Sequence, residues 1–225
     1  MAEKPIGQRS FEQFAERYAE AEPTKPHNAY YNRPAIFSLL PDIAGRCVLD
    51  AGCGPAWHAA DLVDRGAEVV AIDVTPEFVA IATERVGERA TVLEADLTQP
   101  LSFAGDGQFD LVFSSLVLDY IEDWAPVMRE FARVLKPNGT LVFSCGHPQA
   151  DFEYTERRAL SGGNYFDREQ FTTAWTGFGE PYPEVTSWRR PLTDILQPVI
   201  DAGFRLDRIL EPRPTEAFRK ADPED

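Results

Sequence analysis

The pattern of hydrophobic and polar positions changes character near residue 46. Upstream of that point, the stretch 8–21 repeats apolar residues at helical spacing and predicts an amphipathic helix, with Phe11, Phe14, Ala15, Tyr18 and Ala21 on one face. The proline-rich stretch EPTKPHNAYYNRP breaks this helix, and the apolar run AIFSLLP predicts a second, short one. Residues 1–45 are therefore expected to form a helical cap in front of a differently organised core.

From Cys47 onward, short apolar runs alternate with segments of helical periodicity. Five buried strands are predicted over CVLD, EVVAID, ATVLEAD, QFDLVFSS and LVFSC, and FRLDRILEP predicts a sixth. Helices are expected after the glycine turn, from Pro76 to about Val86, around 126–135, and over PLTDILQPVIDAG, while KPNGT indicates a turn. This alternation predicts an α/β fold with a doubly wound, mostly parallel sheet.

The connection between the fifth strand and the last helix is unusually long. Residues 147–190 are rich in glycine, proline and aromatic residues and exceed an ordinary loop. In a doubly wound sheet this segment leaves from the carboxyl edge, where ligands bind, so it is a candidate lid. We expect one domain made of the cap 1–45, the core 46–146, the lid insert 147–190 and a C-terminal helix and strand over 191–225.

The amino-acid composition limits which classes of partner the protein is expected to bind. The 225 residues carry 37 acidic and 22 basic side chains, four of them lysine, for a net charge of −15, which repels nucleic acid. This acidic, lysine-poor composition resembles that of proteins from halophilic archaea and predicts a halophilic protein. No apolar run approaches a membrane span and no signal peptide is visible, so a cytoplasmic protein without membrane attachment is expected. The three cysteines lack metal-ligand spacing, so they are expected to be free thiols and no metal is predicted.

A glycine-rich turn follows the first core strand, in VLDAGCGPAW. It is not a dinucleotide fingerprint, because Trp57 stands where a third glycine is required; a P-loop pattern and a Tyr-x-x-x-Lys pair are also absent. Asp50, before the turn, suits a ligand with an ammonium group. Asp73 ends the second strand about twenty residues later, where a carboxylate accepts hydrogen bonds from ribose hydroxyls, and Asp96 ends the third strand, within reach of an adenine amino group.

Residues 46–146 resemble the core of the class I S-adenosylmethionine-dependent methyltransferases, in particular the methyltransferase type 11-like group that includes quinone-biosynthesis enzymes. The motifs VLDAGCG, AID, EADL, FDLVFSSLVL and RVLKPNGTLVFS occur in the family's order and spacing. The resemblance implies S-adenosyl-L-methionine as cofactor, held by Asp50, Gly52, Gly54, Asp73, Val74, Asp96, Leu97 and Ser114. The chain departs from the family at Ala56, which replaces a glycine, at Asp119, where many relatives have histidine, and in lacking an evident seventh strand.

The resemblance implies methyl transfer by in-line displacement. The strand-four loop lacks an Asn/Asp-Pro-Pro-Tyr-like motif and no Pro-Cys nucleophile is present, which favours a small-molecule acceptor over nucleic acid. The catalytic candidates are His147, after the fifth strand, and Tyr31, in the cap; a turn-stabilising histidine and a packing tyrosine are the structural alternatives. The functional alternative is a non-catalytic S-adenosylmethionine-binding sensor or assembly protein. An exposed sheet edge would invite pairing with another chain, so a homo-oligomer is a further expectation.

Overall fold

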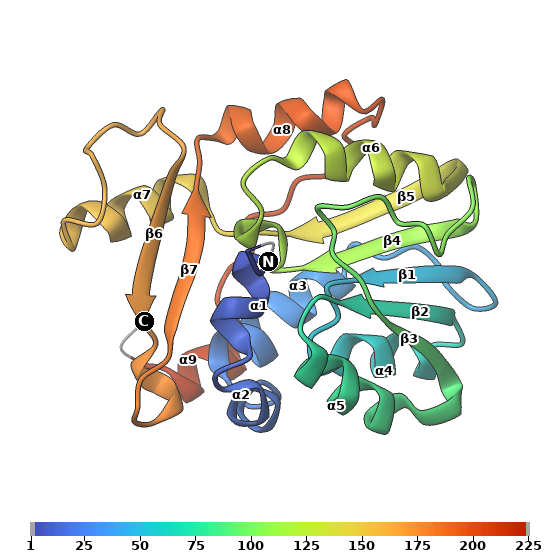
Figure 1. Cartoon of the computed structure of the whole chain (residues 1–225), viewed down its shortest axis with the longest axis horizontal. Helices are drawn as coiled ribbons and strands as arrows, with labels where there is room; N and C mark the ends of the chain where they lie inside the picture. The colour runs from blue at the N-terminus through green and yellow to red at the C-terminus, as the bar shows by residue number, and fades with distance from the viewer. Residues whose placement is uncertain (1–2, 224–225) are drawn as a thin grey trace.

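The computed structural model describes residues 3–223. A five-stranded parallel sheet lies at its centre in the order β3-β2-β1-β4-β5, with helices on both faces (Figure 1). The strands are β1 (Cys47–Ala51), β2 (Glu68–Asp73), β3 (Ala90–Glu94), β4 (Phe109–Ser115) and β5 (Leu135–Ser144). The predicted α/β fold with a doubly wound parallel sheet is confirmed.

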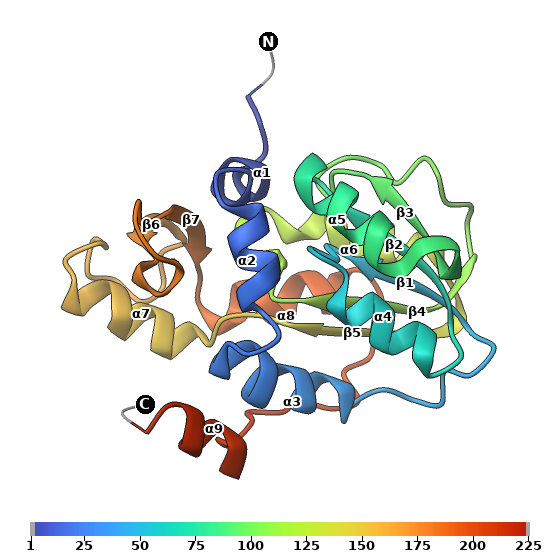
Figure 2. The same cartoon turned by 90° about the horizontal axis from the view of Figure 1, so that it is seen from below.

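The sheet is buried on both faces, which explains the continuous apolar runs of its strands. Successive residues point to opposite sides: Val48 packs in the cluster beneath α3, α4 and α5, whereas Leu49 packs in the cluster beneath α6 and α8 (Figure 2). These helices are α3 (Arg33–Phe37), α4 (Trp57–Asp64), α5 (Pro76–Val86), α6 (Trp124–Val134) and α8 (Leu192–Asp201). The carboxyl ends of the strands therefore meet at one edge of a rigid sheet.

β5 begins earlier than the sequence predicts. Leu135 pairs with Phe109, and the regular register resumes at Thr140, opposite Leu111, so residues 136–139 form an irregularity inside the strand. Asn138 has a φ of 64°, which an asparagine adopts more readily than most residues. The predicted turn thus lies within β5 as a bulge.

The cap differs from the single helix predicted over 8–21. It forms α1 (Ile6–Phe11) and α2 (Ala15–Ala21), separated by a turn in which Phe14 leaves the helical conformation. The break allows the Phe11 and Phe14 rings to stack at 5.6 Å, and both are buried in one cluster with Phe78. After α2, the proline-rich stretch contains a π-helix, His27–Asn32, rather than only a loop.

The insert forms a small substructure of its own. It contains α7 (Pro148–Arg157), β6 (Glu169–Ala174), the 3₁₀ turn η4 (Thr176–Phe178) and β7 (Glu184–Arg189), with β6 and β7 paired antiparallel. This hairpin stands apart from the main sheet, and α1 and α2 lie between the two (Figures 1 and 2). Hydrogen bonds join it to the cap, for example from Thr186 N to Ser10 Oγ at 3.1 Å.

The predicted sixth strand is wrong. Residues 204–212 adopt no regular structure and lead to α9 (Glu216–Ala221). Their alternating apolar positions do not reach the core: the side chain of Ile209, for instance, is 69% exposed. The segment is attached to the cap instead, because the Tyr31 hydroxyl donates to Pro212 O at 2.9 Å and the Thr215 hydroxyl donates to Tyr30 O at 2.7 Å. Proline at 212 also lacks the N–H that a strand ladder requires.

Within residues 3–223, no helix has both the length and the apolar character needed to cross a membrane. Over the same residues, no group of three or more His, Cys, Asp or Glu side chains is arranged to hold a metal ion.

Candidate functional site

The turn after β1 depends on left-handed backbone conformations. Gly52, Gly54 and Ala56 have φ values of 83°, 51° and 63°. A Cβ on Gly52 would come within 2.4 Å of the Val117 side chain, so this position requires glycine for space as well as for conformation. Ala56 is accommodated with a strain of about 1 kcal/mol. Trp57 then begins α4, and its indole Nε1 donates to Ala19 O of α2 at 3.1 Å, which ties the turn to the cap.

Asp73 connects this turn to the end of β2. Its Oδ2 accepts from Gly54 N and its Oδ1 accepts from Thr75 N, both at 2.8 Å. Burial raises the pKa of Asp73, while these backbone hydrogen bonds oppose the rise. Each carboxylate oxygen has a second lone pair. Because Asp73 also lines a cavity, the carboxylate is positioned to accept two further hydrogen bonds from a ligand diol.

That cavity has a volume of about 520 Å³ and opens along the carboxyl edge of the sheet. Five of the eight residues predicted to bind a cofactor line it together with Asp73: Gly52, Gly54, Val74, Asp96 and Leu97. Asp96 is held in place because its Oδ1 accepts from the Thr98 amide and hydroxyl, both at 2.8 Å. The start of α1 covers this end of the cavity, where a Cβ on Gly7 would lie 3.6 Å from Val74.

Asp50 and Ser114, the other two predicted residues, lie beneath the cavity surface. The Ser114 hydroxyl is buried and donates to Ala51 O at 2.9 Å, so it fastens β4 to the start of the glycine turn. The next residue, Ser115, lines the cavity instead, because side chains alternate along a strand. The Asp50 carboxylate is also buried, with Oδ2 lacking a hydrogen-bond partner among residues 3–223.

Polar atoms of Arg33 and His58 also lack hydrogen-bond partners within residues 3–223, namely Arg33 Nε and Nη2 and His58 Nε2. The Arg33 guanidinium nevertheless forms ion pairs with Glu22 and Asp61. Glu22 is buried, with Oε1 3.7 Å from Arg33 Nη2. Burial raises the pKa of Asp50 to about 8 and that of Glu22 to about 7, and lowers the pKa of His58 to about 3. Buried polar groups are normally paired, so the Asp50 oxygen that has no partner among the described residues fits a ligand that supplies a cation.

A second cavity, of about 160 Å³, adjoins the first. Four residues line both: Tyr18, Asn28, Leu116 and Tyr120. Leu116 directly follows β4 and has a φ of 56°, a strained conformation for a leucine of the kind often found at functional sites. The sequence indicated the cap and the insert as possible walls, and the structure brings both here, through Asn28 of the π-helix and through Trp175 and Phe178 of the insert.

The two predicted catalytic residues do not line either cavity. His147 instead precedes α7, where its Nδ1 accepts from Ala150 N at 3.4 Å and its Nε2 lies 3.0 Å from Glu211 Oε1. Tyr31 packs against Phe218 of α9, with its hydroxyl on Pro212. These placements match the structural alternatives for both residues, a turn-stabilising histidine and a packing tyrosine.

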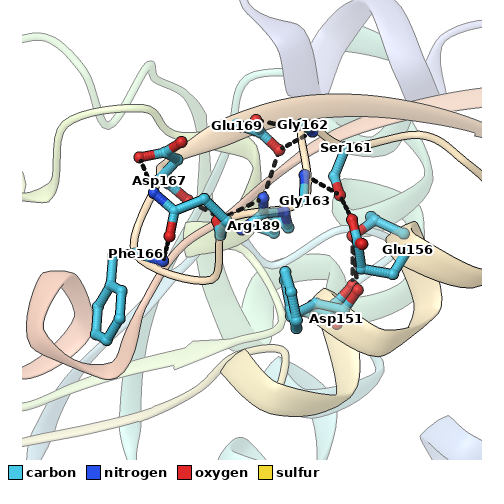
Figure 3. Close-up of polar contacts among 12 residues, drawn as sticks. Asp151, Glu156, Ser161, Gly162, Gly163, Phe166, Asp167, Glu169 and Arg189 are labelled. Atoms are coloured by element: carbon cyan, nitrogen blue, oxygen red, sulfur yellow. Dashed lines mark hydrogen bonds and ion pairs between the residues drawn. The ribbon is translucent and has the colours of Figure 1, made fainter.

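Arg189, at the end of β7, is 1% exposed and holds the insert together (Figure 3). Its guanidinium forms an ion pair with Glu169 and donates to Asp167 O at 3.0 Å and Asn164 O at 3.1 Å. Both oxygens of the Glu169 carboxylate accept from Gly162 N at 3.0 Å. Arg189 therefore stabilises the loop that precedes β6 and lines neither of the two cavities.

Asp119, the position at which the sequence departs from the expected histidine, has a carboxylate that forms a hydrogen bond with the protein backbone. Its Oδ2 accepts from Gly146 N at 2.9 Å and so ties the loop after β4 to the end of β5. Burial raises the pKa of Asp119 to about 6. The sequence did not single out Lys25, Asn28, Glu22 or Arg33 as site residues, because nothing in the local pattern of the cap shows which of its polar side chains turn toward the sheet.

Comparisons with known proteins support one family. The family model described as "Methyltransferase domain" matches residues 49–143, from β1 to the end of β5. The crystal structure of an S-adenosylmethionine-dependent methyltransferase from Mesorhizobium loti has 28% sequence identity and a TM-score of 0.69, covering 85% of this chain and 88% of that one.

Two curated relatives are similar over a shorter stretch. A ubiquinone biosynthesis O-methyltransferase of Xanthomonas oryzae is 33% identical over 60% of this chain and 58% of its own length. A malonyl-(acyl-carrier protein) O-methyltransferase of Enterobacter lignolyticus is 35% identical over 52% of this chain and 47% of its own length. The similarity thus spans about half the length of these two relatives.

Proposed function

We propose that this chain is a class I S-adenosylmethionine-dependent methyltransferase, supported by the matching methyltransferase domain and the 28% identical solved structure, and that it transfers the methyl group of S-adenosylmethionine to a small-molecule acceptor. The cofactor follows from the family. The nature of the acceptor is our inference, and one observation carries it: the cofactor-sized cavity adjoins a second cavity of about 160 Å³, lined by the cap, the insert and the loop after β4.

The residues of the larger cavity fit the cofactor. Its volume of about 520 Å³ lies in the usual range for a site of this kind. Asp73 lines this cavity and supplies a carboxylate for the two ribose hydroxyls. Asp50 Oδ2, which lacks a hydrogen-bond partner within residues 3–223, matches the ammonium of an amino-acid tail. Asp96 and Leu97, which also line this cavity, are assigned to the adenine base of the cofactor. Asp50 acts from beneath the cavity surface in this assignment, and Ser114 supports the strand without touching the ligand.

Bound S-adenosylmethionine supplies a methyl group on a positively charged sulfur, which needs no further activation for displacement. The protein's task is to orient the acceptor and to exclude water. Tyr18 and Tyr120 lie where the two cavities meet, and burial raises the pKa of both phenols, so they remain protonated and can donate hydrogen bonds. The imidazole of His27 also lines the smaller cavity, and we assign it as the candidate acceptor of a proton from the substrate.

The net charge of the protein and the small size of the second cavity both disfavour a macromolecular acceptor. The net charge of −15 opposes nucleic acid, and the smaller cavity has no room for a folded partner's surface. We further expect the protein to act in the cytoplasm. We also expect a homo-oligomer, because β5 is an edge strand of the sheet within residues 3–223 and an edge can pair with another chain.

The test is transfer of an isotopically labelled methyl group from S-adenosylmethionine into a metabolite extract, followed by mass analysis of three fractions: small molecules, nucleic acid and protein. We expect label in a small molecule. Label confined to RNA or protein would overturn the assignment of the acceptor. Tight cofactor binding without transfer into any fraction would instead favour a non-catalytic sensor.

A further inference from the structure

The smaller cavity has a distinctive lining. It is formed by Tyr18, Lys25, His27, Asn28, Leu116, Tyr120, Trp175 and Phe178, and none of these side chains is acidic. In a chain with 37 acidic residues and four lysines, a lysine without a neighbouring acid in a cavity wall is unexpected from composition alone. The lining therefore points to the kind of molecule that the cavity accepts.

The size of the cavity limits the acceptor to about one ring. Its volume of about 160 Å³ is close to that of a cavity that holds benzene, roughly 150 Å³. In the apolar wall, the Phe178 ring stacks on two others: it lies at 21° to Tyr18 and at 24° to Trp175, with centroids 5.7 and 5.6 Å away. Such rings offer stacking and edge contacts to another flat ring.

Lys25 places one positive charge beside these rings. Its ammonium lies 4.2 Å from the centroid of Phe178 and donates to Gly177 O, which orients it on the insert side of the cavity. No carboxylate among residues 3–223 forms an ion pair with it. An ammonium has three donors, so two remain for a ligand. A negatively charged group in the cavity would complete this arrangement.

The opposite end of the cavity is where the methyl group would be transferred. Tyr18 and Tyr120 line both cavities, whereas Lys25, Trp175 and Phe178 line only the smaller one. Asn28 Nδ2 donates to the Tyr18 hydroxyl at 3.2 Å and so fixes that phenol at the junction. The charge of Lys25 is thus available to a part of the acceptor other than the atom that receives the methyl group.

We propose that the acceptor is a single-ring organic acid, held by an ion pair between its anionic group and Lys25, with its methyl-accepting atom between Tyr18 and Tyr120. This proposal rests on the function proposed above and narrows its substrate class. An aromatic cavity also suits a quaternary or primary ammonium ligand through cation–π contacts. Lys25 disfavours a cationic ligand, since binding of that ligand would place two positive charges within the smaller cavity.

The test is binding of matched ligands to the protein saturated with S-adenosylhomocysteine, measured by calorimetry. Hydroxybenzoates and aminobenzoates represent the acid, phenol and benzyl alcohol the neutral ring, and benzylamine and benzyltrimethylammonium the cation. Lys25→Met keeps most of the side-chain volume and removes the charge; Lys25→Arg keeps the charge. Lys220→Met, on the exposed face of α9, is the matched control.

We expect at least one carboxylate to bind tenfold or more tightly than its neutral counterpart. Lys25→Met should remove that advantage, Lys25→Arg should retain most of it, and Lys220→Met should change nothing. Affinity for S-adenosylhomocysteine should stay within twofold in all three variants, which shows that the fold is intact.

Binding of neutral or cationic ligands as tight as that of the carboxylates would overturn the proposal, as would the absence of carboxylate binding at millimolar concentration. Methyl transfer to a neutral or cationic acceptor would contradict the proposal while leaving methyl transfer to a small molecule in place. Conversely, Lys25-dependent binding of carboxylates without methyl transfer to any small molecule would contradict the proposed function and leave an acid-binding pocket.

Discussion

Asp73 at the end of β2 accepts a hydrogen bond from the backbone N–H of Gly54, 2.8 Å away in the turn after β1. One carboxylate thereby sets the shape of the glycine turn and offers its remaining lone pairs to the cavity. Its loss should therefore affect both the ligand and the turn.

Asp73→Ala is expected to weaken binding of S-adenosylmethionine by about 2–3 kcal/mol, roughly 30- to 150-fold, because two ligand hydroxyls lose their acceptor. The variant should also melt at a lower temperature, since Gly54 N and Thr75 N lose theirs. Calorimetric titration with the cofactor gives the first value, and NAD(H), which should not bind, provides the control ligand. An affinity unchanged within threefold would show that Asp73 does not contact the ribose.

Cofactor binding is expected to release protons below pH 8. Burial raises the pKa of Asp50 to about 8 in the free protein, so this carboxyl is largely protonated at pH 6.5 and must ionise to receive an ammonium group. Affinity should accordingly rise between pH 6 and pH 8. Calorimetry at pH 6.5 in two buffers of different ionisation enthalpy measures the released protons, and Asp50→Asn should reduce their number. Equal heats in both buffers would contradict the assignment.

The raised pKa of Asp50 also predicts how the free energy of unfolding of the ligand-free protein depends on pH. The folded pKa of Asp50 is raised from an ordinary value of 3.8, so the folded state binds more protons than the unfolded state across this interval. Its contribution to the free energy of unfolding is complete below about pH 4 and is lost as the pH rises to about 8. Denaturant unfolding at pH 5 and pH 8 should show a smaller loss of stability in Asp50→Asn than in the unchanged protein.

Arg17→Ala is expected to loosen the insert without disturbing the cofactor. The Arg17 guanidinium donates to the carbonyl oxygens of Phe178, Gly179 and Pro181 at 3.0–3.4 Å, and so fastens α2 to the tip of the hairpin. We expect faster hydrogen exchange over residues 176–186 and a raised KM for the acceptor, with cofactor affinity within threefold. Arg157→Ala, on the exposed side of α7, provides a comparison. If both variants behave alike, the hydrogen bonds of Arg17 to the insert have no role in forming the acceptor cavity.

Salt is expected to stabilise the protein. A net charge of −15 creates self-repulsion that is screened at high ionic strength. The thermal midpoint should therefore rise between low salt and molar KCl, as followed by circular dichroism. A midpoint that does not rise would remove the argument for adaptation to a salt-rich environment.

The core of the fold and the position of its main cavity could be predicted from local pattern. Apolar runs of strand length alternate with helical segments, and parallel strands bring their carboxyl ends to one edge. Asp73 is the last residue of β2, as predicted, whereas Asp96 lies two residues beyond the end of β3 at Glu94, in the loop that follows the strand. The side of the strand to which a residue points was harder to predict: Ser114 faces the interior and Ser115 the cavity, because strand alternation depends on a register that pairing sets.

The walls of the second cavity depended on tertiary structure. Phe11 and Phe14 have helical spacing, yet the chain breaks between them because both rings pack in one cluster with Phe78. The alternating residues of 204–212 satisfy the pattern of a strand, but the segment is attached to the cap instead of joining the sheet. His147 and Tyr31 were plausible catalytic residues from their places in the chain. The smaller cavity is instead lined by other residues, including Lys25 and Tyr120. Sequence periodicity shows which residues are buried, and only long-range packing decides what they are buried against.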